Sequence, residues 1–385
     1  MITPRFKQLK RAYGFDEVAI VPGDITINPE QTNIDFKIGE ITFAIPLVAA
    51  SMDAVTDVDF AVLMSKMGGL AVLNLEGIQT KYENTKELLA EIARTPQAEV
   101  TQLLQKLYAA PIKDKLVAER VQAIKRGGGI CAVSSAPANA KRLAPIAIEA
   151  GCDIFCVQST VTSARHVSKS VHGLVFEELV KSVKIPVMVG NCVSYTACLE
   201  LMRTGVSAVL IGVGPGAACT SREVLGVGVP QITATIDSAA ARDTYFAETG
   251  RYVPIITDGG FRKGGDFCKA IVAGADAVMM GSVFAKAKEA PGLGYEWGMS
   301  HPHPTLPRGT RIKVGTTALL QQILFGPTSV TDGSQNFVGA LRTAMGICGA
   351  ADIAEMHNAE MMIAPAITTE GKSYQMEAAR TNISA

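Results

Sequence analysis

The sequence has no excess of charge of either sign. Its 385 residues include 36 Lys+Arg and 36 Asp+Glu, so no basic face for nucleic acid or for a membrane surface is predicted. It also lacks a run of about 18 uninterrupted apolar residues and the apolar core of a signal peptide. These absences favour a soluble, cytoplasmic protein with neither a nucleic acid nor a membrane as partner.

Cysteine is present without the spacing that would give it a structural role. The eight cysteines form no Cys-x-x-Cys pair and no regular framework. Several lie inside apolar, strand-like runs, as free thiols do in a reducing compartment. This pattern again favours the cytoplasm. Because only 19% of residues are charged while 48% are hydrophobic, we expect a large core and extensive buried interfaces.

Apolar runs recur along the chain at regular intervals. Eight short runs are apolar, β-branched or bounded by glycine: 45–51, 70–73, 129–133, 153–157, 186–189, 208–211, 254–257 and 277–280. Most are separated by stretches that read as helices, such as 138–150, 193–204 and 265–273. Alternating strands and helices of this number predict an α/β fold, the (β/α)₈ TIM barrel. An open sheet of six to eight strands is the alternative.

Two segments interrupt this alternation. Residues 76–126 are rich in Lys, Glu, Gln, Leu and Ala and predict two or three amphipathic helices between the second and third strands. Residues 286–327 contain Pro291-Gly292, His301-Pro302-His303-Pro304 and Pro307-Arg308-Gly309 and read as a loop, which we expect to serve as a short flap or an interface. The first of these segments is too short for a second large domain. We therefore expect a single domain over 1–385, with a tail from Ala366 that is flexible or wrapped over a neighbour.

A glycine-rich loop follows the sixth apolar run. Residues 212–216 contain three glycines and a proline, and Cys219 comes three residues later. Glycines allow backbone N–H and C=O groups to approach a ligand closely, and a deprotonated thiol beside them is a nucleophile. The alternative is a tight turn with a buried, inert cysteine. On this loop alone both interpretations stay open.

Polar residues and glycines follow six of the eight runs, where the chemistry of a barrel is located. They are Ser51-Met52-Asp53, Gln158-Ser159-Thr160, Gly190-Asn191, the loop 212–219, Asp258-Gly259-Gly260 and Gly281-Ser282. The last two match the position where barrels commonly hold phosphate. The Asp258 carboxylate is suited to accept hydrogen bonds from ribose hydroxyls. Alternatively, Asp258 caps a helix and the glycines form a simple turn. Six such ends together favour a phosphorylated small molecule bound beside Cys219.

Four motifs in this order resemble those of the IMP dehydrogenase/GMP reductase family. They are 46–56, the loop 212–222 with 226–231, 258–266, and 274–282 with 289–292. The resemblance extends from about residue 15 to about residue 350. It implies a TIM barrel that binds a purine nucleotide.

Roles for single residues follow from this resemblance. It implies that Cys219 is the nucleophile that attacks C2 of the purine, which then becomes a hydride donor. Asp258 would bind the ribose. The 5′-phosphate would lie on Gly260, Gly281 and Ser282, and Met52, Gly298 and Met299 would border the base. Gly216 and Gly259 complete the substrate-binding set that we expect.

The resemblance also implies a nicotinamide cofactor, NAD, and a monovalent cation. On the cofactor side we expect Gln158, Ser159, Asn191, Gly212 and Gly214. Gln158 stands where family members have an aspartate that faces the nicotinamide ribose. The backbone carbonyls of Gly214, Gly216 and Cys219 match the positions that bind a cation, usually K⁺, in the dehydrogenases.

Two longer segments of the sequence also depart from the family. The segment 76–126 is far too short for the pair of CBS domains that the dehydrogenases usually carry there, so the chain resembles a compact branch without them. The short flap has neither the Arg-Tyr pair of the dehydrogenases nor the glutamate of the reductases; Arg308 lies in the corresponding turn. We hypothesise that Arg308, with Ser221, activates the water. The alternative is that Arg308 only pairs with a phosphate or a surface carboxylate.

Three functions fit these residues. The first is an NAD-dependent IMP dehydrogenase that makes XMP for GMP biosynthesis, which the missing reductase glutamate favours. The second is an NADPH-dependent GMP reductase, which the compact length and the reductase-like Gly298-Met299-Ser300 favour. The third is an inactive purine-nucleotide-binding regulator. Barrels of the family associate, so the resemblance also implies a homotetramer or octamer.

Overall fold

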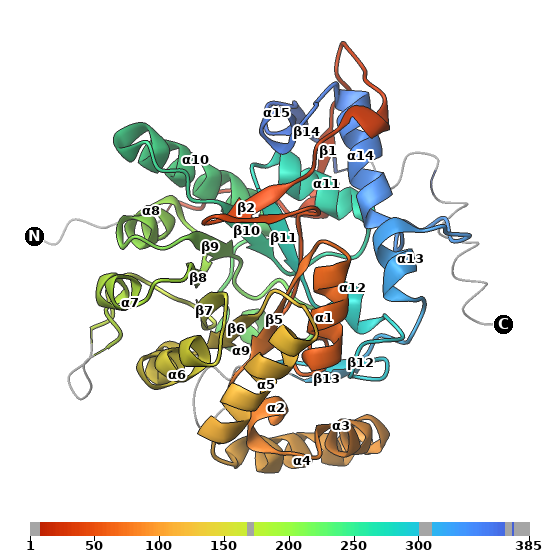
Figure 1. The fold of residues 1–385 in the computed structure, drawn as a ribbon. Helices are drawn as coiled ribbons and strands as arrows, with labels where there is room; N and C mark the ends of the chain where they lie inside the picture. Colours follow the sequence, from red (N-terminus) through yellow and green to blue (C-terminus); the bar gives the residue numbers. More distant parts are fainter. Residues whose placement is uncertain (1–7, 168–172, 300–309, 366–371, 373–385) are drawn as a thin grey trace, which may run out of the picture.

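The structure, a computed structural model, describes residues 8–167, 173–299, 310–365 and 372. Eight parallel strands close into a barrel, each paired with the next along the chain and the last paired with the first (Figure 1). In order they are β4 (Leu47–Ala49), β5 (Leu70–Asn74), β6 (Ala132–Ser135), β7 (Ile154–Gln158), β8 (Val187–Cys192), β9 (Ala208–Ile211), β10 (Ile255–Asp258) and β11 (Ala277–Met280). The TIM barrel is confirmed, and its strands lie at the eight predicted runs.

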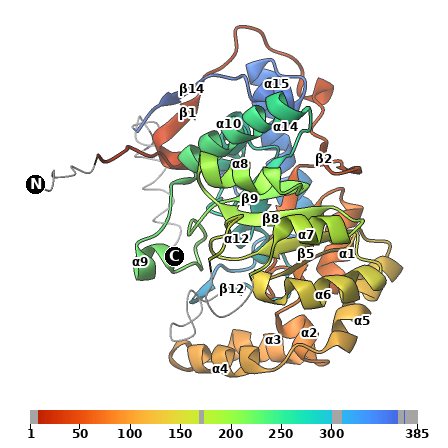
Figure 2. The same ribbon diagram turned by 90° about the vertical axis from the view of Figure 1, so that its left-hand side faces the viewer.

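Helices surround the barrel on the outside (Figures 1 and 2). They are α1 (Val58–Lys66), α5 (Asp114–Arg126), α6 (Pro137–Glu149), α7 (Phe176–Ser182), α8 (Tyr195–Arg203), α10 (Gln231–Thr249) and α11 (Gly264–Val272). Further out, α14 (Phe337–Cys348) packs on α11, and α13 (Leu320–Phe325) packs on α14. Because the strands are covered on both faces, they are apolar throughout rather than alternating, which is why they could be recognised in the sequence.

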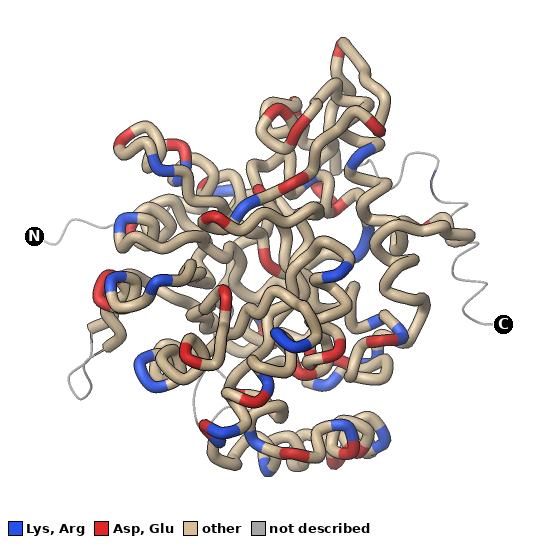
Figure 3. Tube along the Cα trace, viewed as in Figure 1, with Lys and Arg blue, Asp and Glu red and all other residues tan. Residues whose placement is uncertain are grey.

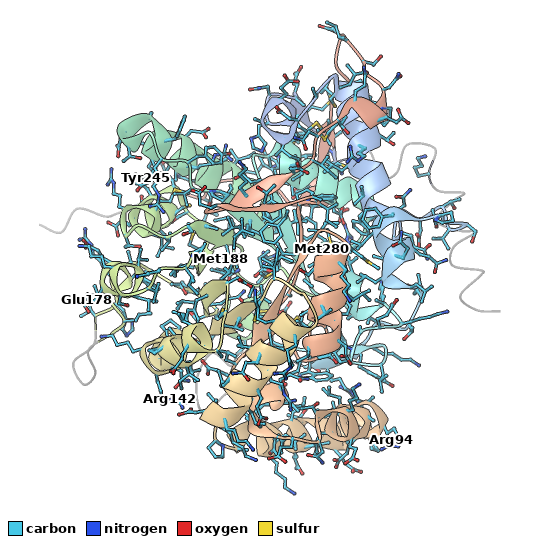
Figure 4. The ribbon with its side chains drawn as sticks, viewed as in Figure 1. Arg94, Arg142, Glu178, Met188, Tyr245 and Met280 are labelled. Atoms are coloured by element: carbon cyan, nitrogen blue, oxygen red, sulfur yellow. The ribbon has the colours of Figure 1, made fainter. Side chains whose placement is uncertain are left out.

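A small hairpin contributes to the core inside the barrel. Strands β2 (Phe36–Ile38) and β3 (Ile41–Phe43) pair antiparallel, and the rings of Phe36 and Phe43 stack with centroids 4.9 Å apart. These side chains share one buried cluster with inward-facing residues such as Met188 of β8. Figure 4 shows Met188 near the barrel axis, whereas Arg94, Arg142 and Glu178 lie at the periphery.

The insertion between β5 and β6 contains four helices rather than two or three. They are α2 (Ile78–Lys81), α3 (Thr85–Arg94), α4 (Gln97–Ala109) and α5. The fourth, α5, packs against α1 and α6 and is therefore the barrel's own helix in this position. Only α2 to α4 are additional, and they lie below the barrel in both views (Figures 1 and 2).

The segment 286–327, expected to be a loop, contains regular structure. Strands β12 (Tyr295–Trp297) and β13 (Arg311–Lys313) pair antiparallel, with Glu296 opposite Ile312, and α13 follows. The prediction was wrong here because each strand has only three residues and the two are far apart in sequence, so neither gives a periodic signal. The residues between them, 300–309, include Arg308 and lie outside the described residues.

The remaining elements are short. Near the ends of the chain, β1 (Val18–Ile20) pairs antiparallel with β14 (Met361–Ile363), accompanied by η1 (Phe15–Glu17), η2 (Pro29–Gln31) and α15 (Ile353–Met356). Two more short helices, α9 (Ser221–Leu225) and α12 (Ser282–Ala285), follow β9 and β11. The predicted tail from Ala366 falls almost entirely outside the described residues.

Figure 3 marks the charged residues along the described chain. In the view of Figure 3, acidic and basic residues alternate over the outer helices and turns. Within the described ranges, no helix has the length and hydropathy needed to cross a membrane.

Candidate active site

A pocket of about 410 Å³ opens at the carboxyl ends of the barrel strands. This volume lies in the usual range for sites that bind small molecules. All eight barrel strands contribute to its lining, through their last residues or the loops that follow, so a closed barrel is needed to assemble it. All the predicted site residues except Arg308 line this pocket: Met52, Gln158, Ser159, Asn191, Gly212, Gly214, Gly216, Cys219, Ser221, Asp258, Gly259, Gly260, Gly281, Ser282, Gly298 and Met299.

Cys219 lies on the loop between β9 and α9 and is partly exposed in the pocket. Its thiol donates a hydrogen bond to Oγ of Ser221 over 3.3 Å, and its backbone N–H donates to the Gly216 carbonyl over 3.0 Å. Arg222 stabilises the loop by donating to the carbonyls of Val213 and Val229. The loop therefore holds the thiol in the pocket and not in the core.

Most of the other cysteines are inert by comparison. Cys131, Cys152, Cys156, Cys192, Cys198 and Cys268 are buried. Burial raises the pKa of the Cys156 thiol well above its ordinary value, with a smaller contribution from the charge of Asp258. Because the thiolate is the reactive form, such a cysteine is a poor nucleophile. Exposure in the pocket thus separates Cys219 from these six thiols.

Asp258 ends β10 and is the centre of a network of amide side chains. Its Oδ2 atom accepts hydrogen bonds from Nδ2 of Asn191 over 2.8 Å and from Nε2 of Gln158 over 3.0 Å. Gln158 in turn accepts a bond from the Ser51 hydroxyl over 2.8 Å. Asp258 is the last residue of β10, whereas α11 starts at Gly264 and has Lys263 at its N-cap. The alternative in which Asp258 caps a helix is therefore wrong.

The pKa of Asp258 is raised to about 6, mainly because burial disfavours its charge, while the bonds from Asn191 and Gln158 act in the opposite direction. Two neutral amides support the carboxylate without neutralising it. The carboxylate retains acceptor capacity for a ligand with hydroxyl groups, such as a ribose. Gln158, which we expected on the cofactor side, therefore forms a hydrogen bond with Asp258, the residue expected to bind the ribose.

Gln231 was not singled out from the sequence, although it lies in the motif 226–231. Its Nε2 atom donates to the carbonyls of Asp258 and Gly259 over 2.8 and 3.2 Å.

Both Gly259 and Gly260 have positive φ (84° and 86°), and a Cβ atom on either would lie 3.2 Å from Pro215. The conformation and the close approach both require glycine, so this turn joins the β10 and β9 loops tightly.

Glu296 is a second residue that the sequence did not indicate. It lies on β12, lines the pocket and is 1% exposed. Its Oε1 atom accepts a hydrogen bond of 2.5 Å from the Ser282 hydroxyl. A Cβ atom on Gly281 would lie 3.6 Å from its Oε2 atom. A buried carboxylate therefore occupies the corner where Gly281 and Ser282 were expected to hold a phosphate.

The insertion packs behind the wall of the pocket, where Tyr108 of α4 contacts the lining residue Met299. The Tyr108 hydroxyl donates to Oδ2 of Asp53 over 2.6 Å and accepts from Nε1 of Trp297 over 2.8 Å. The sulfur of Met299, expected to border the base, lies 3.3 Å from the same hydroxyl and accepts a bond from the Asp53 backbone N–H over 3.4 Å. Helix α4 of the insertion is therefore in contact with the wall of the pocket at Met299.

We expect Tyr108→Phe to lower the free energy of unfolding by about 1–3 kcal/mol, because the buried Trp297 N–H would lose its acceptor. Urea denaturation followed by circular dichroism measures this change. Tyr82→Phe is the matched control: its hydroxyl donates to the Leu107 carbonyl in the same insertion from a half-buried position, so a smaller loss is expected. Equal losses in the two variants would contradict the role given to the Tyr108 cluster.

Comparison with known proteins agrees with this geometry. The model of the IMP dehydrogenase / GMP reductase domain matches residues 12–297. The chain belongs to the IMP dehydrogenase/GMP reductase family. The family implies a purine nucleotide ligand and a nicotinamide cofactor.

The relatives divide into two groups. Uncharacterized oxidoreductases from Mycolicibacterium smegmatis and Mycobacterium leprae are each 36% identical to the chain, over 92% of this chain and 97% of theirs. An inosine-5′-monophosphate dehydrogenase from Methanocaldococcus jannaschii is 25% identical, over 92% of this chain and 93% of its own. The chain thus lies in a compact branch, distant from the true dehydrogenases, and is an oxidoreductase of this family.

A solved structure supports the same placement. The crystal structure of an IMP dehydrogenase/GMP reductase-like protein from Corynebacterium glutamicum superposes with a TM-score of 0.88 at 36% identity, covering 94% of this chain and 96% of that one. The resemblance seen in the sequence is therefore confirmed for the family and the fold.

Proposed function

We propose that this protein is an NAD-dependent IMP dehydrogenase that forms XMP through a covalent bond to Cys219. The observation that carries the proposal is the position of the Cys219 thiol. It is partly exposed in the same pocket as Asp258, while six other cysteines are buried. A thiol in a ligand pocket beside a carboxylate suited to ribose fits nucleophilic attack on a nucleotide base.

In this proposal each residue has a defined task. Asp258, fixed by Asn191 and Gln158, accepts hydrogen bonds from the ribose hydroxyls. The Cys219 sulfur attacks C2 of the base, which becomes tetrahedral and loses a hydride. Water then cleaves the bond between the sulfur and C2, which frees XMP and restores the thiol. Ser221, 3.3 Å from the sulfur, is positioned to orient this water. Arg308 stays a prediction as its activator.

The residues of the pocket fit a nicotinamide group. Besides Cys219, the lining contains several amide and hydroxyl side chains, namely Asn74, Ser134, Ser135, Ser159 and Thr160. Such groups can bond to a carboxamide and to ribose hydroxyls. NAD bound there would supply the hydride acceptor.

The loop also fits a monovalent cation, because carbonyl oxygens are the donors that hard cations prefer. The candidate carbonyls are those of Gly214, Gly216 and Cys219, of which Gly216 already accepts the Cys219 N–H. We propose K⁺ for this position and a homotetramer as the assembly. Rates compared in K⁺ and in Na⁺, and light scattering of the purified protein, test the two points.

Cofactor absorbance at the reduced-nicotinamide band tests the function. The purified protein with K⁺, IMP and NAD is expected to produce a rise in absorbance, with XMP as product. The same protein with GMP and NADPH is the comparison, and a fall in absorbance there would make it a reductase. Tight binding of IMP with no change in either assay would instead favour an inactive, nucleotide-binding regulator.

A further inference from the structure

The corner of the pocket formed by Gly281, Ser282 and Glu296 has the wrong charge for an ordinary phosphate site. Glu296 is buried, and its carboxylate bonds to the hydroxyl of Ser282, a residue expected to donate to phosphate. Where the structure describes the pocket lining, the charged residues are Glu76, Asp258 and Glu296, with neither lysine nor arginine among them. A phosphate dianion here would meet a carboxylate, and no lysine or arginine of the described lining would lie against it.

The position of Glu296 follows from the alternation of side chains along β12. Trp297 belongs to the apolar cluster with the insertion helices, and Tyr295 packs against it. Glu296 therefore faces the other way, into the pocket. Hydrogen bonds between β12 and β13, with Glu296 opposite Ile312, fix this orientation. The hairpin therefore keeps the Glu296 side chain on the pocket side of β12.

We propose that Glu296 is a specificity-determining residue that admits a phosphate only together with a proton, shared between its carboxyl group and the phosphate of the ligand. Two acidic groups at hydrogen-bond distance cannot both be ionised, as pairs of carboxylates in one site demonstrate. A shared proton turns the repulsion into a short, charge-assisted hydrogen bond. The inference rests on the proposed function, because it takes the ligand to be a nucleoside 5′-monophosphate.

The surroundings of Glu296 are consistent with a carboxyl group that holds a proton. Burial raises its pKa, while the Ser282 bond and the charge of Lys286 at the end of α12 act in the opposite direction. Asp258 and Glu76 line the same pocket. On the opposite face of the hairpin, Arg311 is bonded to the backbone of Ile92 and lies over the Tyr295 ring.

The proposal predicts a proton-linked affinity. Above the pH at which Glu296 and the free phosphate are both ionised, each bound nucleotide must take up one proton. The dissociation constant of IMP is then expected to rise about tenfold per pH unit, by linkage. Inosine, which has no phosphate, lacks this dependence.

Titration calorimetry with IMP and with inosine, from pH 6.5 to 8.5, tests the proposal on the full-length protein. In Glu296→Gln we expect the pH slope for IMP to disappear and the affinity for IMP at pH 8 to increase about tenfold. Glu76→Gln is the matched control, because it removes another carboxylate of the same pocket, one that accepts the Ala136 N–H. Its slope is expected to equal that of the wild type.

Identical slopes in wild type and Glu296→Gln, or a slope lost equally in Glu76→Gln, would overturn the assignment. Where Glu296→Gln does not fold, proton uptake by the wild type, measured in buffers of different ionisation enthalpy, decides: about one proton supports the proposal and none overturns it. Turnover is read separately. If IMP binds with the expected pH dependence of its dissociation constant but is not oxidised, the proposed dehydrogenase function is wrong and this inference stands. If IMP is oxidised but its dissociation constant does not change with pH, this inference is wrong and the proposed function stands.

Discussion

Cys219→Ser is expected to lower the rate of IMP oxidation by roughly a thousandfold or more, the range found when a covalent nucleophile is removed. The serine keeps the size of the side chain and its place in the loop, but a hydroxyl is a far weaker nucleophile than a thiolate. Binding of IMP is expected to change little, because the Asp258 network does not involve Cys219. Initial rates and calorimetry on the same preparation separate the two effects.

Cys348→Ser is the matched control for this loss. Cys348 is the other described cysteine that is not fully buried. It is the last residue of α14, its thiol donates a hydrogen bond to the Val21 carbonyl, and it does not line the pocket. Full activity is expected there. Turnover of Cys219→Ser at the rate of the wild type would refute the covalent pathway.

Asp258→Asn is expected to change stability and binding in opposite directions. The pKa of Asp258 is about 6 in the folded protein, against 3.8 as its ordinary value. The folded state therefore holds this proton more tightly, and the stability this provides below pH 4 is lost as the pH rises through about 6. At pH 7 the ionised Asp258 therefore lowers the free energy of unfolding by up to about 3 kcal/mol, and by less where solvent reaches the carboxylate. The neutral asparagine side chain removes this destabilisation.

The same substitution is expected to weaken IMP binding about 10- to 100-fold, since hydrogen bonds to a charged acceptor contribute about 1.5–3 kcal/mol. In the wild type, kcat/KM is expected to rise with pH through about 6 as Asp258 ionises. Urea denaturation at pH 7 and calorimetry measure the two effects. Asp59→Asn is the control, because Asp59 is exposed in a surface ion pair with Lys86. A destabilised Asp258→Asn with normal affinity would contradict the assignment.

The sequence by itself determined the barrel and most of the pocket. Strands that are buried on both faces read as continuous apolar runs, and a turn that needs positive φ needs glycine, as at Gly259 and Gly260. Both signals are local, so they survive in a single chain. Because the ends of parallel strands meet at one edge, the polar residues that follow them could be assigned to one pocket before any contact was known.

Only the tertiary structure decided which side chains touch in that pocket. Gln158 bonds to a residue 100 positions away, and Tyr108 bonds to Trp297 at a separation of 189. No local pattern encodes such pairs, because they form when the barrel closes and the insertion folds under it. Glu296 shows this best. In the sequence it is one acidic residue in a segment expected to be a loop. In the structure, a hairpin of two three-residue strands directs its side chain into the pocket.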